Sequence, residues 1–188
     1  TMSASEWVIS SYLIVISALI LFFGRLGDIK SKSRVFLKGI LAFVLGSLLC
    51  SLSNNIYALV ISRVVQAVGA AMVMSVNQGI ITDVFPANER GKALGINGAF
   101  VALGSILGPA LGGLIITYLN WHYIFIINLP IGIIAYLLGR RILPIHNVNE
   151  NREKIDVKGA VLFILSIFLF KIIGNTIFMN IYYRKTLQ

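Results

Sequence analysis

Three polar side chains lie in one long apolar segment, residues 56–81, where an isolated polar group is costly. They are Arg63, Gln66 and Asn77, which share one sector of a helical wheel at about 100° per residue. Inside a bilayer such side chains usually face a water-filled cavity or a neighbouring helix. For Arg63 we favour a cavity-lining role over hydrogen bonding between helices. For Gln66 and Asn77 both interpretations stay open.

A second group of candidate residues follows the first apolar run. The segment Gly24-Arg25-Leu26-Gly27-Asp28 precedes basic residues at positions 30, 32, 34 and 38. Its two glycines permit a tight turn, and Asp28 can cap the next helix or pair with a basic side chain. The basic cluster is suited to anionic lipid headgroups, and the alternative is a solvated loop. Similarly, Asp83, Glu89 and Arg90 could form a charge network at a gate or simply a polar turn.

Glycine recurs along the apolar segment from Ala93 to Tyr118 in a pattern that a water-soluble helix would not tolerate. An interior Gly costs about 1 kcal/mol and an interior Pro about 3 kcal/mol in water. In a bilayer the helix persists, and missing side chains let neighbouring helices approach. One stripe contains Gly104, Gly108 and Gly112, and a second contains Gly91, Gly95, Gly98 and Gly113. We expect two close neighbours, and a kink where Pro109 leaves the carbonyl of Ser105 without its donor.

The sequence contains no motif typical of an enzyme. There is no Gly-rich phosphate loop, no HExxH and no Ser-His-Asp arrangement, and His122 and His146 have no partners at metal-ligand spacing. The single cysteine, Cys50, lies in an apolar run, where we expect it to pack. We therefore expect no catalytic residue, no metal and no cofactor, and an ion gradient would have to supply the energy for any transport.

Composition and charge distribution indicate an all-α polytopic membrane protein. Hydrophobic residues make up 57% of the 188 residues and charged residues only 12%, against about a quarter charged in soluble domains. The net charge of +9 does not indicate a nucleic-acid partner, because most of the 16 Lys and Arg fall in residues 25–38, 90–92 and 140–158. The alternate connections, 51–55 and 120–123, contain none. By the positive-inside rule the basic stretches face the cytoplasm.

Six segments are long enough to cross a bilayer core, which takes about 20 helical residues. They are Trp7–Leu26, Val35–Leu52, Ile56–Ile81, Ala93–Tyr118, Tyr123–Leu143 and Val157 to about Tyr183. The sixth is atypical, because Lys171 lies at its centre and Arg184 and Lys185 would lie outside, against the charge rule. We interpret residues 171–188 as an atypical tail, truncated or non-native, and the start at Thr1 as a second cut end.

Four motifs together resemble the major facilitator superfamily, and within it the 14-span drug:proton antiporters. They are Gly24-x-Leu26-Gly27-Asp28; Arg63-x-x-Gln66-x-x-Gly69; Gly104-x-x-x-Gly108-Pro109-x-x-Gly112-Gly113; and Trp121-His-Tyr-Ile-Phe-Ile-Ile-Asn128-Leu-Pro130-Ile-Gly132. In order, they resemble the loop motif after the second span, the fourth-span motif, the fifth-span antiporter motif and the start of the sixth span. The resemblance extends from about Ser5 to Phe170.

This resemblance implies a partial N-terminal half of the helical bundle. Residues 1–170 would correspond to spans two to seven of about 14, with the first span and the second half missing. Arg63 would line the central cavity and take part in proton relay, Asp28 would help to latch the outward-facing state, and the glycine stripe would pack on the opposite half. Ile29 replaces a usual basic residue, Ser31 a usual glycine and His122 a common arginine. The first two departures put the usual charge pairing of the loop in doubt.

These features favour an exporter in a bacterial cell membrane that exchanges small hydrophobic or cationic compounds for protons. Its partners would be the lipid bilayer, the substrate, protons and the second half. A metabolite facilitator or symporter of the same superfamily is the main alternative, and a membrane-embedded enzyme or scaffold is a third. We expect the isolated 188 residues to be inactive, because alternating access requires two halves that rock against each other.

Overall fold

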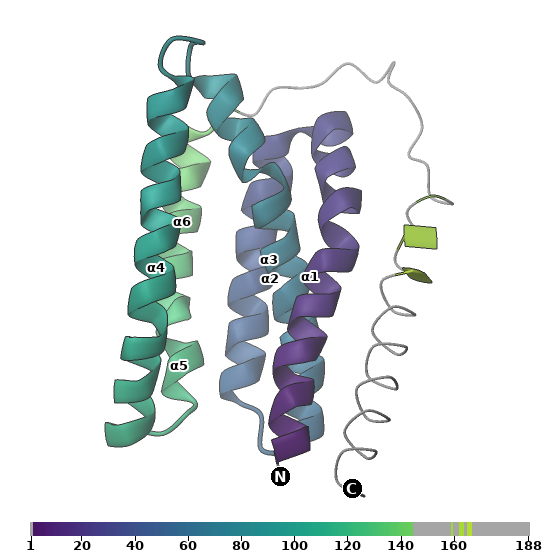
Figure 1. Ribbon diagram of the computed structural model, residues 1–188, viewed down its shortest axis with the longest axis vertical. Coiled ribbons are helices and arrows are strands. Elements are labelled where there is room, and N and C mark those ends of the chain that lie inside the picture. Colours follow the sequence, from purple (N-terminus) through teal and green to yellow (C-terminus); the bar gives the residue numbers. More distant parts are fainter. Residues whose placement is uncertain (1, 145–158, 160–161, 164, 167–188) are drawn as a thin grey trace, which may run out of the picture.

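The computed structural model describes residues 2–144, 159, 162–163 and 165–166, and every regular element among them is a helix (Figure 1). The helices are α1 (Met2–Lys30), α2 (Lys32–Ser51), α3 (Ile56–Val84), α4 (Arg90–Tyr118), α5 (Tyr123–Ile126) and α6 (Asn128–Ile142). Together they provide five segments long and apolar enough to cross a membrane, the fifth being α5 and α6 combined. The all-α class and five of the six predicted spans are thus confirmed. The sixth, like the predicted tail at 171–188, lies almost entirely outside the described residues.

All the basic connections between the described helices meet at one end of the bundle, which we call the basic end (top of Figure 1). A cavity of about 650 Å³ lies there, and its lining includes Arg25 and Lys32 from the α1–α2 region, Arg90 from α4, and Pro144 after α6. At the opposite end the α2–α3 and α4–α5 connections approach each other, since Nε2 of His122 lies 3.3 Å from the carbonyl oxygen of Ser53. The basic connections thus lie at one end of the bundle and the connections without Lys or Arg lie at the other, which is the alternation that the positive-inside rule describes.

The connection between α1 and α2 differs from the prediction. Residues 24–28 are helical and belong to α1, so the tight turn predicted from Gly24 and Gly27 is wrong. Ser31 alone separates the two helices, with φ 130° and ψ 122°. Positive φ is readily adopted by glycine but is strained in residues with a Cβ. Ser31 therefore stands where the resembled loop motif usually has a glycine, and its backbone conformation is one that favours glycine.

The closest helix packing lies between α2 and α3, and glycines make it possible. A Cβ built on Gly46 would lie 2.7 Å from Cβ of Gln66 and closer still to the Gln66 backbone. A Cβ on Gly69 would lie 2.7 Å from both the carbonyl oxygen of Gly39 and Cα of Phe43. Real Cβ atoms essentially never approach neighbours within 3.0 Å. Small residues allow membrane helices to approach this closely. Gly39 and Gly46, seven residues apart on α2, are the sequence feature that could have indicated this contact.

Around this contact the other helices pack more loosely. α1 lies mainly on α3, and α6 lies on α2. An apolar cluster of Val35, Val76 and Ile80 closes the α2–α3 interface toward the basic end.

The glycine-rich helix α4 lies at the edge of the described bundle and touches it sparsely (Figure 1). It has no buried residue, and a Cβ built on Gly104, Gly108, Gly112 or Gly113 would meet no atom within 4 Å. The two close neighbours predicted for α4 are therefore absent from the part of the chain that the structure describes. The helix continues through Pro109. Packing of this face against an opposite half stays a prediction.

The predicted fifth span consists of α5 and α6, which meet at Ile127. Ile127 keeps helical dihedral angles, φ −60° and ψ −26°, and its N–H donates to the carbonyl oxygen of Tyr123 at 3.1 Å. Pro130, inside α6, has no N–H to donate to the carbonyl of Ile126, four residues earlier.

We predict that Gly69→Ala destabilises the described bundle by about 1–3 kcal/mol, because the new methyl group must push the α2 backbone away. Gly104→Ala is the matched control, since its methyl group enters open space and replacing Gly with Ala favours a helix by about 1 kcal/mol. Thermal unfolding of both variants in detergent would check this. Equal melting temperatures would contradict the packing argument.

We predict that Ser31→Gly stabilises the protein by about 1–3 kcal/mol, the usual cost of a strained non-glycine conformation. Ser31→Ala keeps the Cβ and should show no such gain. The measurement is the melting temperature in detergent, and a rise in Ser31→Ala that equals the rise in Ser31→Gly would mean that the backbone at 31 is not strained.

Candidate functional site

Arg63 lies where α3 faces both α1 and α5. It is seven residues into α3, about 10 Å along the helix axis from Ile56 at 1.5 Å per residue. Its Nη1 donates a hydrogen bond of 2.6 Å to Oε1 of Gln66. The guanidinium carbon lies 3.9 Å from the ring centroid of Tyr12 on α1 and 5.9 Å from that of Phe125 on α5. Nε of Arg63 is buried and has no hydrogen-bond partner among the described residues.

Gln66 connects the guanidinium to α2. Its side chain is 1% exposed, and its Nε2 donates a hydrogen bond of 2.7 Å to Oγ of Ser47. The Ser47 hydroxyl in turn donates 2.8 Å to the carbonyl oxygen of Phe43, and Sγ of Cys50 lies 4.0 Å from Oε1 of Gln66. Cys50 is itself fully buried, as its predicted packing role requires. The chain Arg63–Gln66–Ser47 is thus a polar path through the interface between α3 and α2.

Asn77 contacts a different helix from Gln66. Its Nδ2 donates a hydrogen bond of 3.1 Å to Oδ1 of Asn97 on α4. Of the three polar residues predicted to share a sector of α3, the structure therefore joins Arg63 to Gln66 and places Asn77 in a separate contact. Asn97 was not singled out from the sequence, although an amide in an apolar span was a usable signal.

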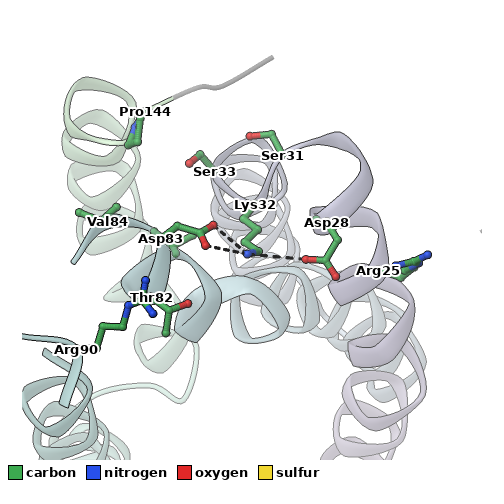
Figure 2. A pocket seen from close by; sticks show the side chains of 12 residues that line it. Arg25, Asp28, Ser31, Lys32, Ser33, Thr82, Asp83, Val84, Arg90 and Pro144 are labelled. Carbon is green, nitrogen blue, oxygen red and sulfur yellow. Dashed lines mark hydrogen bonds and ion pairs between the residues drawn. The ribbon is translucent and has the colours of Figure 1, made fainter. Parts of the chain in front are cut away.

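A compact group of three charged residues lies at the basic end. It consists of Asp28, Lys32 and Asp83, which we call the charge cluster (Figure 2). Nζ of Lys32 lies 2.9 Å from Oδ2 and 3.2 Å from Oδ1 of Asp83 on α3, and 3.9 Å from Oδ1 of Asp28. Asp28 therefore pairs with a basic side chain, whereas the N-cap position of α2 is Ser31. The cluster ties α1, α2 and α3 together despite the replacement of the usual basic residue by Ile29.

The α3–α4 connection contributes less to this cluster than its charges suggested. Arg90 bonds to the backbone, where its Nε donates 3.1 Å to the carbonyl oxygen of Phe85. Only Asp83 from this region pairs with Lys32. Because Lys32 and both aspartates are partly solvated, each pair adds at most about 1 kcal/mol to stability, and its main effect is to fix the relative positions of three helix ends.

The predicted site residues thus fall into four separate places, one of which is the contact of Asn77 with Asn97 between α3 and α4. Arg63 and Gln66 lie in the bundle between α1, α2, α3 and α5. Gly24, Leu26, Gly27 and Asp28 lie on the last turns of α1, where a Cβ on Gly27 would lie 2.5 Å from Cγ1 of Val76. The glycine-proline residues of α4 lie on an open face. Sequence reasoning missed Tyr12, Ser47 and Phe125, because each is typical of an apolar or interfacial segment and gains its role only from its neighbours in space.

The described spans, with a guanidinium held inside the helical bundle, define a polytopic integral membrane protein. This chain belongs to the major facilitator superfamily, whose family model matches residues 1–186. It is 47% identical over 162 residues to a riboflavin transporter of Clostridioides difficile, a match that covers 86% of this chain and 36% of that protein. It is 35% identical over 161 residues to multidrug resistance protein 3 of Bacillus subtilis, covering 86% of this chain and 31% of that protein.

A multidrug transporter of Bacillus subtilis shows the same pattern, with 35% identity over 140 residues, 74% of this chain and 26% of the relative. The chain therefore spans about a third of the length of these curated relatives. The family and its relatives are transporters, so the resemblance inferred from the four motifs is confirmed at the level of the superfamily.

We predict that Gln66→Leu destabilises the bundle by about 1–3 kcal/mol, because it removes the acceptor of Arg63 and the donor to Ser47 inside the protein. Gln78→Leu is the matched control, since Gln78 is exposed on the same helix. Chemical unfolding in detergent micelles compares the two. If Gln66→Leu were as stable as Gln78→Leu, the polar path would not contribute to folding.

Proposed function

We propose that this chain acts as part of a proton-coupled exporter of small hydrophobic or cationic compounds in a bacterial cell membrane. The observation that supports it best is the guanidinium of Arg63, held within a span by one amide and two aromatic rings. Two of the similar proteins are named as multidrug proteins. Intramembrane charges of this kind typically mark substrate or ion pathways.

Arg63 would contribute a fixed positive charge to this exchange. A guanidinium stays protonated at all physiological pH values, so it cannot itself carry the exchanged proton. It would instead lower the proton affinity of an acidic group brought beside it. Among residues whose side chains the structure describes, the acidic ones are Asp28, Asp83 and Glu89, all at the basic end. We propose that an acidic group and the opposing wall of the cavity come from a second transporter half.

The charge cluster and the α4 glycines fit the same proposal. The Asp28–Lys32–Asp83 contacts hold three helix ends as one unit, which is what a gate at one end of a rocking half requires. The open glycine face of α4 would receive the second half at close range. On this proposal the 188 residues alone do not transport.

A second candidate is a carrier of a planar metabolite. It is favoured by the 47% identity to a riboflavin transporter, higher than the identity to either multidrug relative cited above. Uptake that dominates over efflux in whole cells, for a flavin and not for cationic dyes, would favour this candidate over the exporter.

We predict that Arg63→Ala in the full-length transporter lowers proton-driven dye accumulation in inside-out vesicles at least tenfold, and that Arg63→Lys retains part of it because the charge is kept. Arg141→Ala, at the exposed end of α6, is the matched control for loss of an arginine. Accumulation is compared before and after the proton gradient is collapsed. Normal accumulation by Arg63→Ala, or accumulation that ignores the gradient, would refute proton coupling through Arg63.

A further inference from the structure

The surroundings of Arg63 contain more aromatic surface than hydrogen-bond acceptors. The described residues offer its guanidinium one acceptor, Oε1 of Gln66, and leave Nε unpartnered. The ring of Tyr12 lies 3.9 Å from the guanidinium carbon, well within the range of about 6 Å over which a cation is attracted to a ring face. In a site with little water this attraction is stronger than at an exposed surface.

Phe125 adds a second aromatic ring from a different span. Its centroid lies 5.9 Å from the guanidinium carbon, near the limit of the same range. Phe125 is itself held edge-on against Trp121, at 6.2 Å and 89°, and Trp121 is stacked on His122 at 3.7 Å. His122 reaches the Ser53 carbonyl oxygen. The ring of Phe125 is thus fixed by contacts that continue to the outer connections.

We propose that Tyr12 and Phe125 form an aromatic clamp that positions the Arg63 guanidinium and offsets part of its charge in place of a carboxylate. Tyr12 is the stronger member, because its ring is the closer, and it belongs to α1, which packs on α3. The clamp leaves the side chain charged and still able to interact with an approaching acidic group. A carboxylate in the same position would neutralise the charge and remove that response.

The proposal rests on the proposed role of Arg63 in proton-coupled transport, and it makes Tyr12 a positioning residue that acts through Arg63. Removing the ring should weaken coupling while leaving the substrate path open. Tyr12→Phe keeps the ring face and loses only the hydroxyl, so it should behave like the unaltered protein. Tyr57→Leu is the matched control for Tyr12→Leu, because Tyr57 is 80% exposed on α3.

The test uses the full-length transporter in proteoliposomes, with a cationic dye added to the outside solution. For each variant it measures dye accumulation driven by a proton gradient and dye equilibration without one. Tyr12→Leu should lower gradient-driven accumulation about tenfold and leave equilibration within twofold of the Tyr57→Leu value. In an Arg63→Lys background the Tyr12→Leu change should have less than a threefold effect, because the positioned group has already been altered. If Tyr12→Leu does not fold, as judged by size-exclusion chromatography, Phe125→Leu takes its place with the same expected direction.

Each of the other outcomes refutes either the aromatic clamp or the proposed function. If Tyr12→Leu accumulates dye like Tyr57→Leu while Arg63→Ala does not accumulate it, the clamp is refuted and the proposed function stands. If Tyr12→Phe loses accumulation as Tyr12→Leu does, the hydroxyl matters and the clamp is refuted. An equal loss from Tyr12→Leu in the Arg63→Lys background also refutes it, since Tyr12 would then act independently. Normal accumulation by Arg63→Ala refutes the proposed function itself.

Discussion

The close approach of α2 and α3 is the constraint on which the rest of the described structure depends. At Gly46 the two backbones come so near that no Cβ could be accommodated beside Gln66. The next residue, Ser47, is thereby within hydrogen-bond distance of the Gln66 amide, and the other atom of that amide accepts from Arg63. Unpaired polar groups are costly in a dry interior, so a glycine without any chemistry of its own determines whether the arginine can be held there.

Arg63 is held by the polar path on one side and by aromatic contacts on the other helices. Gln66 fixes one terminal nitrogen, and the rings of Tyr12 and Phe125 bring α1 and α5 to the same group. Three spans therefore converge on one charge. The opposite arrangement occurs at the basic end, where one lysine joins two aspartates near solvent (Figure 2). Both arrangements join spans through charge, but only the first lies inside the helical bundle, where Nε of Arg63 is buried.

The open side of the described bundle is as informative as its packed side. α4 carries the densest glycine pattern, yet a Cβ built on its glycines would meet no atom of the described residues within 4 Å, while the sparser glycines of α2 and α3 are tightly packed. Glycine frequency therefore did not identify the tightest helix contact. Packing of this face of α4 against an opposite half stays a prediction.

The sequence by itself determined the membrane class, five of the spans, the grouping of the basic connections at one end and the superfamily, because hydrophobic length, basic residues and short motifs are local properties. It also singled out Arg63, Gln66 and Asp28. Only the tertiary structure decided that Gly24 and Gly27 continue a helix, that Ser31 makes the turn, and that Asn77 pairs with Asn97 rather than with the Arg63 path. It alone brought Tyr12, Ser47 and Phe125 to the central polar residues. These contacts depend on the rotation and spacing of whole helices, which packing between distant segments sets and which no local pattern encodes.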